Sequence, residues 1–175
     1  LTVTQSLKKY GGSLIALSSQ GVRIAAGAIA TVQSFHPDDN PNDNLLNVRN
    51  DGALTILTGS KRAVANNVVN YGDLYVHGSD SVRPVVDFLK NHGNAVFDGP
   101  VDFGSPGIAD QLDGSLTISG SMPLPSTVRV YGGSLTGQGS LGTIDHRGGW
   151  VAPGNPTGVL SVGSDPRRAH FRPAE

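Results

Sequence analysis

Hydrophobic and polar residues alternate in a sequence pattern that recurs along the chain. The pattern reads DGALTILTGS at 51–60, YGDLYVHGS at 71–79, DGSLTISGS at 113–121 and YGGSLTGQGS at 131–140. Each of these copies contains a glycine, called the marked glycine below, that is followed two residues later by a leucine. A further apolar residue usually follows two positions after the leucine, and the residues between them are mostly polar. When apolar residues recur at every second position, their side chains lie together on one face of a β-strand. Each copy therefore predicts a short strand with one buried face.

The copies are spaced at a nearly constant interval. Successive marked glycines are separated by 20, 21, 21 and 19 positions, and a second apolar group such as NNVVN at 66–70 precedes the mark. Repeats of this length are typical of solenoids, in which each coil buries its apolar face against its neighbours. We therefore predict an all-β, right-handed parallel β-helix with coils of about 20 residues, in which the leucines share one interior column. The marked glycines are Gly52, Gly72, Gly93, Gly114 and Gly133, and the column leucines are Leu54, Leu74, Leu116 and Leu135.

The glycines and asparagines of the repeat predict the corners of the coils. Glycine accepts a positive φ and a close approach of another backbone, both of which a sharp turn between sheets requires. Asn50, Asn70 and Asn91 recur two residues before a marked glycine. Stacked asparagines on neighbouring coils can hydrogen-bond to one another in a ladder, although asparagine also suits a turn without any ladder. Both interpretations are open at this point.

Composition supports short strands and limits the classes of partner. Only 37% of residues are hydrophobic and 15% are charged, whereas the chain contains 24 glycines and 11 prolines, which favours many strands broken by turns. The net charge is −1 and no run of Lys or Arg exceeds two residues. We therefore expect no nucleic-acid partner and no binding to an anionic membrane surface.

The absence of cysteine from the chain excludes a disulfide framework and a thiolate metal site. It fits proteins that cross an oxidising periplasm without being cross-linked. The chain begins with Leu1 and shows no charged start followed by an apolar run, so we expect a processed or excised piece whose targeting segments lie outside it. No stretch approaches the roughly 18 uninterrupted apolar residues of a membrane span.

The segment from Gly132 to Ser164 resembles the end of the passenger domains of bacterial autotransporters. In that family a glycine-rich coil precedes a phrase of the type V-x-P-G-N-x-x-G-x-L-x-V, and here VAPGNPTGVLSV occupies 151–162. The same phrase occurs in other secreted bacterial β-helix proteins. The resemblance implies an exported β-helix at the bacterial surface or secreted across the outer membrane, and it implies that the coils nearest the C-terminus form first.

The domain organisation predicted from these patterns is a β-helix over 1–164 and a C-terminal tail over 165–175. A loop near 35–44 is expected to protrude between coils, because proline, asparagine and aspartate crowd there. Its candidate contact residues are His36, Asp38, Asp39 and Asp43. Carboxylate and amide oxygens on a loop can also bind calcium, but the spacing matches no EF-hand. We interpret the loop as a contact surface.

The predicted function is that of a stalk or adhesive scaffold, without cofactor, metal or catalytic residues. Its expected partners are a host or neighbouring-cell surface, a matrix protein, a glycan, or another copy of the chain. The alternative is a polysaccharide-degrading enzyme of the pectate lyase or hydrolase type, with candidate carboxylates at Asp98, Asp102, Asp110 and Asp113, of which Asp98 and Asp102 form the candidate acidic pair. The other aspartates of this half, Asp110 and Asp113, are assigned to turns. Trp150 is predicted to cap the core of the last coil rather than to bind a sugar.

Overall fold

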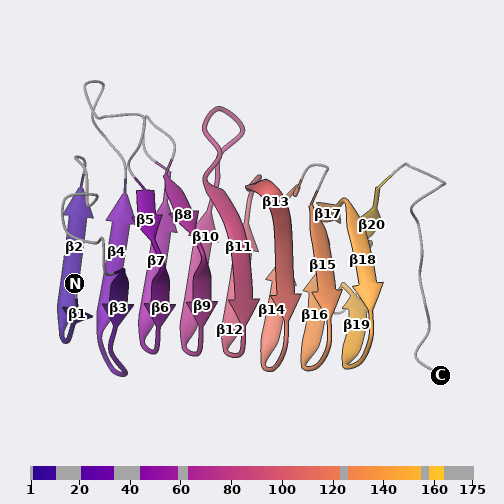
Figure 1. Cartoon of the computed structure of the whole chain (residues 1–175). Helices are drawn as coiled ribbons and strands as arrows, with labels where there is room; N and C mark the ends of the chain where they lie inside the picture. The colour runs from indigo at the N-terminus through magenta and orange to yellow at the C-terminus, as the bar shows by residue number, and fades with distance from the viewer. Residues whose placement is uncertain are drawn as a thin grey trace.

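The computed structural model describes residues 2–10, 21–33, 44–58, 63–122, 126–154 and 158–163. All regular elements in these residues are strands, and they stack coil upon coil into an elongated β-solenoid (Figure 1). Every pair of neighbouring strands runs parallel, and equivalent residues on successive coils lie about 20 positions apart. The predicted all-β parallel β-helix is therefore confirmed. Among the described residues no helix has the length and hydropathy to cross a membrane.

Two long sheets form opposite walls of the solenoid. The ten-stranded sheet runs in the order β1-β3-β6-β9-β11-β13-β15-β18, with β5 and β8 joined beside β11, and the eight-stranded sheet runs in the order β2-β4-β7-β10-β12-β14-β16-β19. The strands of the ten-stranded sheet are β1 (Thr2–Val3), β3 (Val22–Ile24), β5 (Asn44–Leu46), β6 (Val48–Asn50), β8 (Val64–Asn66), β9 (Val68–Asn70), β11 (Val85–Asn91), β13 (Asp102–Gln111), β15 (Thr127–Val130) and β18 (Thr143–His146).

The marked copies of the recurring sequence pattern lie on five consecutive strands of the eight-stranded sheet, from β7 to β16. The strands of this sheet are β2 (Ser6–Tyr10), β4 (Ile29–Gln33), β7 (Ala53–Leu57), β10 (Asp73–His77), β12 (Asn94–Asp98), β14 (Ser115–Ile118), β16 (Ser134–Gly137) and β19 (Trp150–Pro153). A short third sheet pairs β17 (Ser140–Leu141) with β20 (Ser161–Val162).

The register of the eight-stranded sheet puts the predicted leucines in one interior column. Leu54 pairs with Leu74, Leu74 with Ala95, Ala95 with Leu116, and Leu116 with Leu135. All five side chains are at most 2% exposed. The core therefore consists of aligned apolar rows, because each coil alone is too thin to bury its own apolar face.

The marked glycines stack at the corner that leads into this sheet. A Cβ atom placed on Gly72 would overlap the carbonyl oxygen of Gly52 on the preceding coil, and the same overlap recurs from coil to coil up to Gly133. The backbones at this corner therefore approach too closely for any side chain. The interpretation of these glycines as corner residues is correct.

An asparagine ladder fills the interior beside that corner. The Nδ2 group of Asn50 donates to Oδ1 of Asn70 at 2.7 Å, Asn70 donates to Asn91 at 2.8 Å, and Asn91 donates to Oε1 of Gln111 at 2.7 Å. All four side chains are fully buried. The ladder interpretation is confirmed, and Gln111 is a rung that the asparagine pattern did not predict.

Trp150 does not cap the core, so that prediction is wrong. The residue pairs with Ser134 at an outward-facing position of β19, and it is 78% exposed. The inward position on this strand belongs to Val151, which packs against the core. The side-chain alternation of β19 therefore puts the tryptophan on the outer surface.

Candidate functional site

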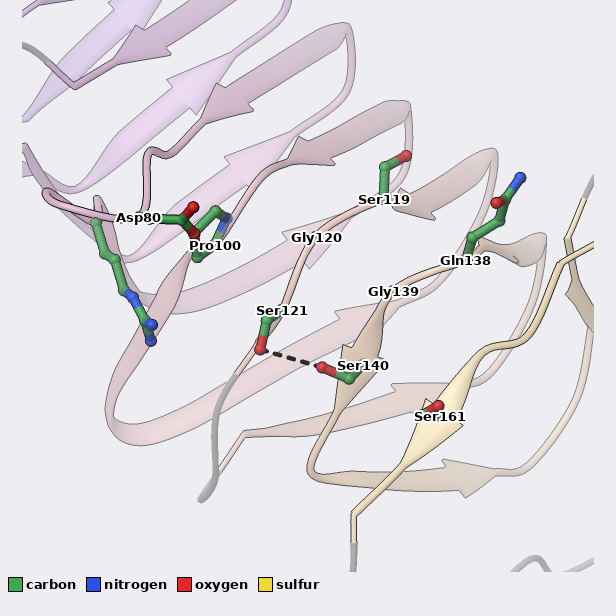
Figure 2. Close-up of a pocket in the computed structure, with 10 residues that line it drawn as sticks. Asp80, Pro100, Ser119, Gly120, Ser121, Gln138, Gly139, Ser140 and Ser161 are labelled. Carbon is green, nitrogen blue, oxygen red and sulfur yellow. Dashed lines mark hydrogen bonds between the residues drawn. The ribbon is translucent and has the colours of Figure 1, made fainter.

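An open, shallow groove of about 420 Å³, lined mainly by residues with polar side chains and by glycine, lies at the corner where strands of the eight-stranded sheet end (Figure 2). This volume is within the range of small-ligand sites. The groove extends over successive coils and combines hydroxyl, amide, carboxylate and guanidinium groups. Its lining residues are Asp80, Arg83, Pro100, Ser119, Gly120, Ser121, Gln138, Gly139, Ser140 and Ser161.

The groove is concave because a row of glycines separates two rows of residues with side chains. A Cβ atom on Gly120 would overlap the backbone of Gly99, and one on Gly139 would overlap the carbonyl oxygen of Gly120. The floor therefore cannot carry side chains. On one side of it stand Ser119 and Gln138, and on the other side stand Ser121, Ser140 and Ser161 (Figure 2).

Serine hydroxyls form one wall of the groove. Ser121 bridges to Ser140 on the next coil, and Ser140 pairs in parallel register with Ser161 on the coil after that. The Ser140 hydroxyl donates to Oγ of Ser121 at 3.1 Å, as Figure 2 shows. The hydrogen of Ser121 and the lone pairs of Ser140 remain to face a ligand, because each hydroxyl has one donor and two acceptor sites.

The loop between β10 and β11 supplies the charged end of the groove. This loop projects from the stack in Figure 1. Ser79 stabilises the turn of this loop through two hydrogen bonds with Val82. Its backbone N–H donates to the carbonyl of Val82 at 3.1 Å, and its Oγ accepts from the N–H of Val82 at 3.2 Å. Arg83 lies 3.6 Å from the Asp102 carboxylate in an ion pair that is partly exposed. Asp80 and Arg83 thus contribute opposite charges to the lining.

A second polar cluster borders the groove on the outer face of the sheet. The Tyr75 hydroxyl donates to Oδ2 of Asp98 at 2.7 Å, and Nδ1 of His77 lies 3.2 Å from the same oxygen. The hydrogen bond from Tyr75, with a smaller contribution from His77, holds the pKa of Asp98 below its usual value despite some desolvation. The same hydrogen bond raises the pKa of Tyr75. Asp98 therefore faces solvent as a carboxylate beside a neutral tyrosine.

We predict that replacing Tyr75 with phenylalanine raises the pKa of Asp98 toward its usual value. The lowered pKa stabilises the fold at pH values above the unfolded-state pKa, and this stabilisation is lost as the pH falls through the folded-state pKa. This contribution to the stability of the fold is small, because the Asp98 side chain is 45% exposed. NMR titration of the Asp98 carboxyl carbon measures the shift. An unchanged pKa in the Tyr75→Phe chain would contradict the assigned hydrogen bond, and Thr55→Ser is the control on the preceding strand.

The candidate carboxylates of the enzyme alternative have separate partners. Asp98 ends β12 and contacts Tyr75 and His77, whereas Asp102 begins β13 in the other sheet and pairs with Arg83. The assignment of Asp110 to a turn is wrong, because it lies within β13, is only 8% exposed, and has Nε of Arg129 at 3.5 Å from Oδ1.

Histidine and carboxylate side chains meet across coils in a way that local spacing did not reveal. His77 contacts Asp98 and His92 contacts Asp113, at 3.2 and 3.1 Å, and each pair is 21 residues apart. A search for carboxylates one coil length after each histidine in the sequence would have predicted both pairs. In the part of the chain that the structure describes, no group of three His, Cys, Asp or Glu side chains is arranged to hold a metal ion.

The contact residues predicted in the loop near 35–44, which are His36, Asp38, Asp39 and Asp43, lie outside the described residues. The sequence analysis did not predict the groove, although the repeat contains a pattern that indicates it. A Gly-Ser pair closes several copies of the repeat, as in Gly120-Ser121 and Gly139-Ser140, and stacking brings those pairs to one corner.

Comparison with known proteins identifies no family for this fold and groove. No protein-family model matches the chain, and neither the curated proteins nor the solved structures give a match. Function therefore has to be inferred from the groove and from the polar cluster beside it.

Proposed function

We propose that this chain is an exported β-helix of the bacterial surface or secreted fraction, and that it acts as a stalk or adhesive scaffold. The groove carries the proposal, because it presents hydroxyl, amide and charged groups on a frame whose core and ladder are fully buried. The serine and glycine rows of the groove belong to this stacked frame, so few groups have to be ordered when a partner binds them. The expected partners are host or neighbouring-cell surfaces, through a matrix protein or a glycan.

The autotransporter-like phrase supports export. It covers β19 from Val151 onward and all of β20, so it contributes to the last described coil, and Ser161 within it lines the groove. The resemblance and the candidate binding site thus share residues.

The alternative of a polysaccharide-degrading enzyme has less support. Glycoside hydrolysis requires two carboxyl groups that face one scissile bond, about 5 to 9.5 Å apart. Asp98 and Asp102 belong to different sheets and bind different partners. Of the described residues that line the groove, one carries a carboxylate, Asp80.

A binding and activity test on one preparation separates the two functions. We expect the fluorescently labelled chain to bind saturably to cultured epithelial cells, bacterial cells, or surfaces coated with matrix protein or glycan. We also expect no reducing or unsaturated ends from polygalacturonate, with or without calcium. Binding to none of these surfaces would contradict the scaffold function, and product release that is abolished by Asp98→Asn would establish the enzyme instead.

A further inference from the structure

We infer that the groove binds a neutral, linear oligosaccharide that lies along the axis of the coil stack. The inference rests on the proposed function and specifies the ligand class of its binding site. It follows from three properties of the groove: its hydrogen-bonding chemistry, the direction of its rows, and its charge.

The side chains of the groove both donate and accept hydrogen bonds. Serine hydroxyls and the Gln138 amide each do so, and they supply five of the ten lining residues. Sugar hydroxyls have the same dual character, so a glycan can satisfy donors and acceptors together. The lining offers one apolar side chain, Pro100, and therefore no pocket for the apolar anchors that usually hold a bound peptide.

The rows of the groove run from coil to coil. Ser121, Ser140 and Ser161 follow one another on consecutive coils, and neighbouring strands are spaced about 4.8 Å apart. Equivalent backbone positions thus repeat along the stack at a spacing close to the size of a sugar ring, and the Ser121 and Ser140 hydroxyls form a pair 3.1 Å apart within this row. The glycine floor lets a chain of rings approach the backbone along the whole row. This arrangement fits an extended polymer better than a single small molecule.

Charge favours a neutral ligand. Among the described lining residues the one cation, Arg83, is paired with Asp102, while Asp80 lies in the lining and Asp98 borders it as a carboxylate. Three carboxylates thus accompany one guanidinium. A uronic-acid polymer would bring further negative charge to this surface and would be repelled.

The test uses the full chain and defined hexasaccharides. Isothermal titration with neutral hexamers of glucose, mannose, galactose and N-acetylglucosamine is expected to show binding for at least one of them, and hexagalacturonate is expected to bind at least tenfold more weakly. The double variant Ser121→Ala/Ser140→Ala removes the serine pair of the groove. We expect it to weaken the binding of the preferred neutral hexamer about tenfold, as loss of two hydrogen bonds implies.

A matched pair of hydroxyls outside the groove provides the control. Thr117 and Thr136 lie on the same two coils with their Oγ1 atoms 3.0 Å apart, and neither lines the groove. The variant Thr117→Ala/Thr136→Ala should bind the hexamer like the unmodified chain, and circular dichroism of both variants should be unchanged. If no neutral hexamer binds, or if both double variants bind equally well, the inference is wrong.

The outcomes also distinguish this inference from the proposed function. Adhesion to cells or matrix that survives in the Ser121→Ala/Ser140→Ala chain would leave the scaffold function intact and remove the groove as its glycan site. Saturable binding of peptides from the matrix proteins, with no binding of hexasaccharides, would replace the glycan with a protein partner. Loss of both glycan binding and adhesion in the unmodified chain would remove both proposals.

Discussion

Replacing Asn70 with alanine is expected to lower the free energy of unfolding by about 3 to 5 kcal/mol, because it breaks the ladder in its middle. The Asn70 amide accepts from Asn50 and donates to Asn91, and it also donates to the carbonyl of Asn94 on the next coil at 3.1 Å. The alanine variant leaves several buried polar atoms without partners, each costing about 1 to 3 kcal/mol. Urea denaturation followed by circular dichroism measures the loss.

A second, exposed asparagine pair provides the control for this prediction. Asn67 donates to Oδ1 of Asn47 at 3.1 Å, and Asn67 has a positive φ of 53°. Asn67→Gly removes the side chain and keeps the backbone conformation accessible. We expect it to cost less than about 1 kcal/mol, since water replaces the lost partner. Equal losses for Asn70→Ala and Asn67→Gly would mean that the buried ladder does not stabilise the fold.

Replacing Leu74 with aspartate is expected to unfold the chain or cause it to aggregate. Leu74 is 2% exposed and lies between Leu54 and Ala95 in the interior column. The variant would bury a carboxylate among apolar side chains and remove a packed leucine, with a combined cost above about 5 kcal/mol. That cost equals the whole stability of a marginal domain. The measurement is the soluble yield and the thermal unfolding transition of the purified variant.

An aspartate on the opposite face of the same sheet is the matched control. Thr117 faces outward on β14, where it is only half-buried, and its hydroxyl contacts Thr136. Thr117→Asp should fold and change stability by less than about 1 kcal/mol. A soluble, cooperatively folding Leu74→Asp chain would contradict the assignment of the leucine column to the interior.

The repeat made the interior of this protein predictable. A strand buries every second residue, so Leu54 and Leu74 could be assigned to one column from spacing alone. The ladder required a further step, because asparagine also suits turns, and only the coil stacking decides between the two. Gln111 departed from the pattern since it stands three residues before Gly114 instead of two. Its longer side chain still reaches Asn91.

The outer surface was less predictable because it depends on contacts between coils. His77 and Asp98 are remote in the sequence, and only the 21-residue register brings them together. The groove depends on which corner the Gly-Ser pairs occupy, and neither alternation nor composition specifies that corner. Strand β13 shows the limit of periodicity most clearly. Its register with β11 shifts between Val86 and Phe88, and this irregular strand holds Asp110, which local sequence assigned to a turn.

The central claim is that residues one coil apart align to form both the core and the groove, and cross-linking tests it most directly. The chain has no cysteine, so an introduced pair reports only its own distance. Ser121 and Ser140 bridge neighbouring coils with their Oγ atoms 3.1 Å apart, which suits a disulfide. Ser121 and Ser161 are two coils, or roughly 10 Å, apart. We predict that the Ser121→Cys/Ser140→Cys chain forms an intramolecular disulfide under mild oxidation while the Ser121→Cys/Ser161→Cys chain does not. Failure of the first pair to close, or equal closure of both pairs, would contradict the account.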